Sequence, residues 1–243
     1  MPQLISSAPG RPVGRALCTR LLVGLVGCLP LASAPAGAAY KLVAPPASGD
    51  PIRVHHYELD NGLQVFLSEN REEPRFYAEI VIRAGGKHDP AVSTGIAHYL
   101  EHMLFKGTDR IGTVDFAAEK IHLDRIAALY EEHSAATDPA RREEIYSHIN
   151  AESQLAAPYS IPNEIAHAYE AMGEHHLNAH TSMEETVYKV SLPSNRLEQW
   201  ARIESERFRR PVFRLFQTEL ETVYEEKNRS MDNKHRLIRE AVQ

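Results

Sequence analysis

Three stretches in the first half of the chain have the residue pattern of β-strands. Residues 54–59 and 63–67 flank Asp60-Asn61-Gly62, a sequence typical of a tight turn, and therefore predict a β-hairpin. Residues 76–83 alternate between apolar and polar positions and end before Gly85-Gly86. Three strands in succession predict an antiparallel sheet with one buried face.

Apolar residues at three- and four-residue spacing then predict helices. The first covers residues 94–105, with Ser93 or Thr94 as N-cap and Gly107 beyond its C-terminal end. Residues 114–157 predict a helical hairpin, because Thr137-Asp138-Pro139 ends one helix and starts the next.

Further elements are expected in the last third of the chain. A short helix reaches Met172, residues 177–190 have a strand pattern, and a helix extends from Ser194 to Phe208. Thr218 and Glu221 have the spacing of a capping box for a final helix. The fold class predicted is α+β, an antiparallel β-sheet flanked by helices.

The first 38 residues have the order of a bacterial-type export signal. Three arginines precede an apolar segment that begins at Leu21, and Ala36-Gly37-Ala38 is a typical cleavage site. The apolar segment is short and contains Pro30, so a retained transmembrane helix is the weaker alternative. Leu25-Val-Gly-Cys28 also resembles a lipobox, so membrane attachment is expected only if Cys28 is lipidated. We expect a periplasmic or secreted protein in which residues 39–52 form a linker.

Charge and cysteine content limit the possible partners and metal ligands of the chain. Lys and Arg total 27 against 33 Asp and Glu, and this acidic balance argues against a nucleic-acid partner. Both cysteines, Cys18 and Cys28, lie within the predicted signal, so the rest of the chain has no disulfide and no thiolate metal ligand. Because this part of the chain has no cysteine, its metal ligands are expected to be histidines and carboxylates. All 13 histidines follow residue 54.

The most specific local feature is His98-Tyr-Leu-Glu101-His102, within the predicted first helix. Residues four apart lie on one face of a helix, so His98 and His102 can present two imidazoles to one metal ion. Glu101 would lie beside that ion and could accept a proton from water. The alternative is a pair of surface histidines beside a glutamate on an amphipathic helix.

The motif is the inverted zinc signature H-x-x-E-H, and its surroundings resemble the pitrilysin/insulinase family of zinc peptidases, which includes the mitochondrial processing peptidases. The resemblance runs from about residue 54 to the C-terminus and includes Leu59-Asp-Asn-Gly-Leu63, Arg83-Ala-Gly-Gly86 and Gly95 to Thr108. It implies a pitrilysin/mitochondrial-processing-peptidase-like domain that binds one Zn²⁺ per chain. It also implies hydrolysis of peptides or unfolded polypeptides, with Glu101 as the general base.

The remaining site residues are implied by the same resemblance. The stretch from Glu219 to Glu226 matches the family segment that supplies a third zinc ligand, which implies Glu226 as ligand and Glu219 as a supporting catalytic carboxylate. Helix geometry alone does not exclude Glu225 as the ligand. The segment Asn178-Ala179-His-Thr181 resembles an edge strand that binds extended peptide substrate through Asn178, Ala179 and Thr181.

The spacing of the motifs bears on how complete the domain is. The stretch from His102 to Glu226 is longer than in compact family members, and a helical insertion at about residues 120–165 accounts for the surplus. Residues 53–243 are therefore expected to form an incomplete N-terminal catalytic domain. The resemblance implies a second homologous half or subunit that completes a chamber. Alternatives are a non-catalytic peptide-binding or assembly subunit, an inactive fragment, and a generic α/β domain with surface histidines.

Overall fold

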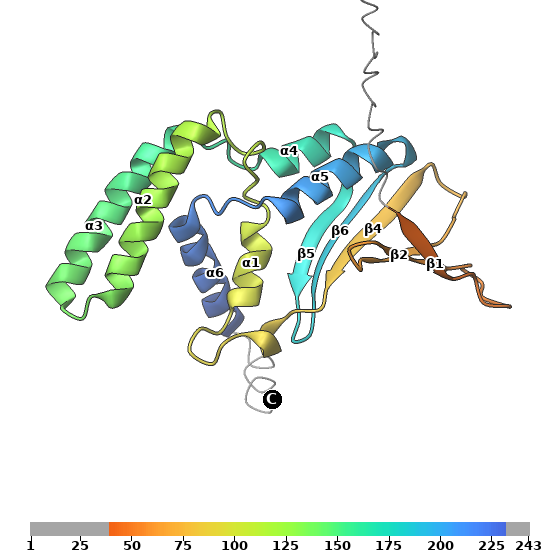
Figure 1. Ribbon diagram of the computed structural model, residues 1–243, viewed down its shortest axis with the longest axis horizontal. Coiled ribbons are helices and arrows are strands. Elements are labelled where there is room, and N and C mark those ends of the chain that lie inside the picture. The colour runs from red at the N-terminus through yellow and green to blue at the C-terminus, as the bar shows by residue number, and fades with distance from the viewer. Residues whose placement is uncertain (1–38, 232–243) are drawn as a thin grey trace, which may run out of the picture. The chain divides into compact units, whose positions relative to one another are not determined.

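The computed structural model describes residues 39–231, which form two compact units that divide after Glu69 (Figure 1). The first unit is an antiparallel sheet of β1 (Tyr40–Ala44), β2 (His55–Leu59) and β3 (Gln64–Leu67), in that order. The predicted hairpin is confirmed, because β2 pairs with β3 across the turn that contains Gly62. Part of the predicted linker is a strand, since β1 pairs with β2.

The second unit is built on a sheet of β4 (Arg75–Ile82), β6 (Thr186–Pro193) and β5 (His175–Thr181), in that order. Both pairings are antiparallel. The prediction that the first three strands form one antiparallel sheet was wrong, because β4 pairs along its whole length with β6 in a second sheet. An alternating pattern indicates a strand with one buried face but does not identify its neighbour.

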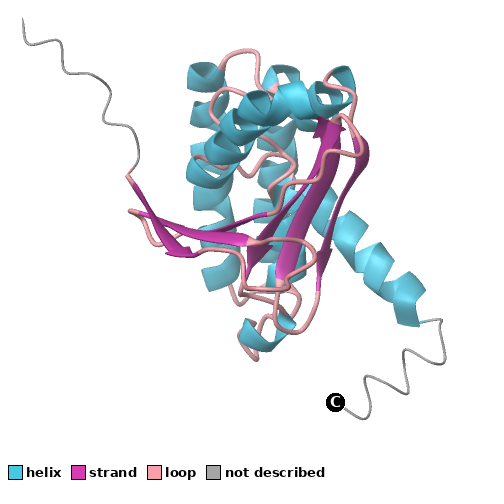
Figure 2. Ribbon diagram, turned by 90° about the vertical axis from the view of Figure 1, so that its right-hand side faces the viewer, coloured by secondary structure: helices cyan, strands magenta, loops and turns pink. Residues whose placement is uncertain are grey.

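Two helices cover one face of this sheet, α4 (Glu164–Ala171) and α5 (Leu197–Arg209). Figure 2 shows these layers, with helices in cyan and strands in magenta. The centre of the core consists of Ile165, Tyr169, Val190 and Leu192. On β4 the exposed positions alternate with partly buried ones, as expected for a sheet covered on one side. The predicted α+β class, an antiparallel sheet flanked by helices, is confirmed.

The predicted helical hairpin is also present, as α2 (Phe116–Ala135) and α3 (Pro139–Ala156). Leu129, Ile145 and Ile149 form a separate small core between the two helices. The side chain of Asp138 caps α3 by accepting a hydrogen bond from the backbone N–H of Arg141, and a proline occupies the first turn.

The helix that carries the histidine motif is α1 (Ile96–Met103), and neither Ser93 nor Thr94 caps it. Its N-cap is Gly95, with a φ of 93°. The carboxylate of Asp89 accepts hydrogen bonds from the N–H groups of Gly95 and Ala97, at 2.6 and 2.9 Å. A side chain from the preceding loop therefore replaces the predicted local cap.

The final helix, α6 (Phe216–Met231), lies next to α1, and α1 also lies beside β5 (Figure 1). The predicted capping box was wrong, because α6 begins before Thr218 and includes it. The ring of Tyr99 meets the ring of Phe216 edge-on at 4.9 Å, and its hydroxyl donates to the Phe216 carbonyl at 2.5 Å. These contacts hold α1 and α6 together.

The predicted export signal, with its cleavage site and Cys28, lies outside the described residues. Among residues 39–231, no helix combines the length and the apolar character needed to cross a membrane.

Candidate metal centre

Helices α1 and α6 bring three potential metal ligands together. The Nε2 atoms of His98 and His102 lie 3.2 Å apart on one face of α1. From α6, Oε2 of Glu226 lies 3.7 Å from Nε2 of His98 and 3.5 Å from Nε2 of His102. The three side chains thus converge although Glu226 is distant from the motif in sequence, and the packing of α1 on α6 produces this proximity.

These distances fit a tetrahedral zinc ion. Bonds of about 2.0–2.1 Å at tetrahedral angles separate two ligand atoms by roughly 3.3 Å, which is close to all three separations. Two imidazoles and one carboxylate are also a ligand set found in catalytic zinc sites, where the fourth position is left for water or substrate. His98 and His102 are partly exposed and Glu226 is exposed, so solvent can reach the site.

Glu219 supports the centre from a position two turns before Glu226 on α6. Its Oε1 lies 2.8 Å from Nδ1 of His102, and its other oxygen pairs with the ammonium group of Lys106. Burial works to raise the pKa of Glu219, but hydrogen bonds from Lys106 and His102 outweigh it and hold the pKa below its usual value. A carboxylate that accepts a hydrogen bond from the Nδ1–H group leaves the Nε2 lone pair of His102 directed at the metal position.

The structure places the two candidate glutamates of α6 differently. Glu226 belongs to the three-residue cluster. Glu225 is 74% exposed and lies 3.9 Å from Arg229, one turn further along the helix. Of the two alternatives left open by the sequence, only Glu226 lies within reach of the histidine pair.

Glu101 lies on α1 directly before His102 and is 8% exposed. Its Oε2 accepts a hydrogen bond from the hydroxyl of Thr181 on β5, at 2.6 Å. Such a hydrogen bond restricts the rotation of the carboxylate and occupies one of its two oxygens. Thr181, the residue expected to contact substrate, thus also contacts the candidate general base through its side chain.

The predicted substrate strand β5 pairs with β6 alone among the described strands. The N–H of Ser182 donates to the carbonyl of Glu185 at the hairpin turn. Hydrogen-bonded and non-hydrogen-bonded pairs alternate along an antiparallel ladder, so the main-chain groups of Thr181 and Ala179 point away from β6. By the same rule the main-chain groups of Asn178 point toward β6, so its exposed side chain is the part of the residue left unpaired by the sheet.

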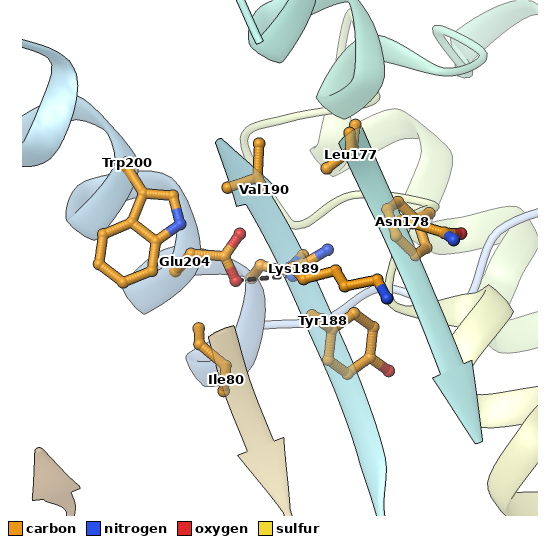
Figure 3. A pocket seen from close by; sticks show the side chains of 10 residues that line it. Ile80, Leu177, Asn178, Tyr188, Lys189, Val190, Trp200 and Glu204 are labelled. Atoms are coloured by element: carbon orange, nitrogen blue, oxygen red, sulfur yellow. Dashed lines mark hydrogen bonds and ion pairs between the residues drawn. The ribbon is translucent and has the colours of Figure 1, made fainter. Parts of the chain in front are cut away.

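A small pocket lies on the side of the sheet that α5 covers (Figure 3). It is lined by Tyr188 of β6 and by Trp200 and Glu204 of α5, among others. Its volume of about 10 Å³ corresponds to about one water molecule. The pocket is too small for a peptide, whereas the outer edge of β5 is paired with no other described strand.

Two residues that support the centre were missed from the sequence, Lys106 and Asp89. Lys106 lies beyond the end of α1 at Met103 and pairs with Glu219 of α6, so no local spacing predicts its role. Asp89 precedes the helix by several residues and reaches its N-terminus only through the fold of the intervening loop.

Comparison with known proteins identifies the family. The profile of Insulinase (Peptidase family M16) matches residues 64–138 and 148–243. The probable zinc protease PqqL of Haemophilus influenzae is 44% identical over 62 residues, 25% of this chain and 7% of the relative. Protease 3 of Escherichia coli is 32% identical over 83 residues, 34% of this chain and 8% of the relative. The matched segments therefore span only a small part of these relatives.

Solved structures show the same fold. The first half of the periplasmic protease PqqL from Escherichia coli has a TM-score of 0.51 and 20% identity, covering 81% of this chain and 32% of that chain. The periplasmic protease PqqL itself has a TM-score of 0.52 and 21% identity, covering 83% of this chain and 17% of that chain. Since the family profile matches most of residues 64–243, the chain belongs to the insulinase family, peptidase family M16.

Proposed function

We propose that this chain carries the zinc-binding part of an exported metalloendopeptidase. The observation that carries the proposal is the convergence of His98, His102 and Glu226 at separations suited to a tetrahedral metal ion. The buried carboxylate of Glu219, which orients His102, is the type of supporting partner found at zinc ligands. The names of the relatives, zinc protease and protease 3, agree with this function.

The protein residues divide the work of peptide hydrolysis. The chemistry that zinc supplies when bound is Lewis acidity towards a carbonyl oxygen and towards water. Glu101 accepts the proton of the attacking water and then donates it to the amine that leaves when the C–N bond breaks. Thr181 holds the Glu101 carboxylate in place during both transfers.

The substrate is proposed to be a peptide or unfolded polypeptide that adds to β5 as a further strand. The outward main-chain groups of Ala179 and Thr181 would pair with it, and the side chain of Asn178 would assist. Main-chain pairing of this kind gives affinity whatever the substrate sequence. It also brings a peptide bond close to Glu101, because Thr181 belongs to the edge strand and its side chain contacts that carboxylate.

Export and partnership are part of the proposal. The order of arginines, apolar segment and small residues in the first 38 residues supports a periplasmic or secreted location, with lipidation at Cys28 as the variant that would add a membrane anchor. A mature protein that begins near residue 39 by mass spectrometry would establish signal cleavage. A second homologous half or subunit is proposed to complete the substrate chamber, in line with a neighbour described as the first half of a protease.

The test separates the peptidase from a non-catalytic binding subunit. Metal analysis of the purified chain should give one zinc per chain, and His98→Ala should remove it. Glu101→Gln should retain zinc but abolish peptide cleavage by the protein joined to its second half. A chain that binds peptides without any zinc would instead support the binding subunit, and cleavage that persists in Glu101→Gln would refute the assigned base.

A further inference from the structure

A buried arginine binds the loop that follows α1, and the proposed mechanism does not use it. Arg214 is 1% exposed and lies between α5 and α6. Its guanidinium donates to the carbonyls of Lys106, Thr108 and Ile111, at 3.1, 2.5 and 3.2 Å. The fourth partner is the carboxylate of Glu119 on α2, at 2.7 Å. The group thus joins the loop after α1 to the helical hairpin.

The loop after α1 is closely fitted to this guanidinium. Gly107 has a φ of +102°, and a Cβ there would lie 2.1 Å from the Ile111 carbonyl oxygen and 3.0 Å from Nη1 of Arg214. Gly112 is similarly close, with 3.2 Å from a Cβ to the same nitrogen. Only glycine at these two positions allows the loop carbonyls to converge on the arginine.

The same loop holds the residue that supports Glu219. Arg214 binds the main-chain carbonyl of Lys106, and the ammonium group of Lys106 pairs with Glu219, which in turn contacts His102. Arg214 also immediately precedes Leu215 and α6, the helix that carries Glu219 and the ligand Glu226. One buried side chain therefore fixes the loop after α1 and the start of α6 together.

We propose that Arg214 and Glu119 are positioning residues, through which the helical hairpin of α2 and α3 holds the zinc ligands of α1 and α6 in register. This inference rests on the proposed zinc function. It assigns a role to the hairpin, which holds none of the three ligands. The hairpin is thereby a brace for the metal centre, and Glu119, 1% exposed, is its ionic attachment. Tyr130 and Tyr146 of the hairpin add direct contacts to α6, at Phe216 and Gln217.

The chemistry of the pair explains why these residue types are needed. An arginine presents five N–H donors in a rigid plane, which matches three carbonyls and one carboxylate, whereas a lysine cannot reach acceptors spread in this way. Removing Glu119 leaves the guanidinium buried without its counter-charge, and a buried charge without a partner disturbs its surroundings. That disturbance would be transmitted to Lys106, whose carbonyl shares the same guanidinium.

Zinc affinity and cobalt spectra of the full chain test the proposal without relying on activity. Zinc dissociation constants of Glu119→Gln and Arg214→Lys are measured by competition with a chromophoric chelator, beside thermal unfolding of the metal-free proteins. We expect zinc binding about 10-fold weaker in each variant, as for other partners that orient metal ligands. The d–d absorption of Co²⁺ in the site should change as well. The controls are Glu144→Gln and Arg141→Lys, which alter an exposed pair on the same hairpin.

A double-mutant cycle between Glu119→Gln and Lys106→Met should show that their effects on zinc affinity are not additive. Variants that unfold at lower temperature but keep wild-type zinc affinity and cobalt spectrum would reduce the pair to a structural role and overturn the inference, leaving the proposed function intact. A wild-type chain that binds no zinc would overturn the proposed function and the inference with it.

Discussion

The hydroxyl of Thr181 donates to Oε2 of Glu101 across 2.6 Å, and this hydrogen bond links the edge strand β5 to the helix of the histidine motif. Thr181→Val keeps the shape of the side chain but removes the donor. A hydrogen bond to a charged group contributes about 1.5–3 kcal/mol, so kcat for peptide hydrolysis should fall by roughly 10- to 100-fold. Zinc content and KM should change little. Thr181→Ser, which retains the hydroxyl, should recover most of the rate, and equal losses in both variants would contradict the role.

Replacing Lys106 with Met should weaken zinc binding. Glu219 would lose the ammonium group that helps to keep its pKa low, and it would then orient His102 less firmly. Loss of such a partner typically lowers metal affinity by about 10- to 100-fold. Chelator competition measures the change. Lys120→Met provides the matched control, since Lys120 pairs with Asp124 on the exposed surface of α2.

Gly107→Ala should destabilise the second unit by several kcal/mol. The positive φ alone disfavours alanine by about 1 kcal/mol, and the new Cβ would clash with the Ile111 carbonyl, so loop and arginine must both move. Denaturant unfolding followed by circular dichroism gives the free energy. The comparison is Gly62→Ala, where φ is +82° but no atom beyond the two neighbouring residues lies within 4 Å of the added Cβ. Similar losses at the two glycines would show that the close contact is unimportant.

Asp89→Ala should loosen the start of α1. The variant loses the acceptor for two backbone N–H groups, and loss of a helix cap costs about 0.5–2 kcal/mol. Amide hydrogen exchange at residues 95–98 should accelerate. Asp89→Asn retains a side-chain oxygen, so its exchange rates should lie between those of the wild type and of Asp89→Ala. Unchanged exchange in Asp89→Ala would contradict the assigned capping role.

Most helices and strands could be predicted from the sequence because each depends on local spacing and local end signals. The helical hairpin is the clearest case, since Asp138 and Pro139 stop one helix and start the next in sequence and in structure. Two of the predicted end signals failed. Asp89 caps α1 in place of Ser93 or Thr94, and the capping-box residue Thr218 lies inside α6.

The sequence by itself determined the two histidines and the intervening glutamate, because an i, i+4 pair on a helix shares one face in any fold. It also determined the α+β class and, through its motifs, the family. Tertiary structure decided which strand pairs with β4, which glutamate of α6 meets the histidines, and that Lys106 and Thr181 support the centre. These relationships join residues far apart in the chain, and packing between elements sets them where no local pattern can.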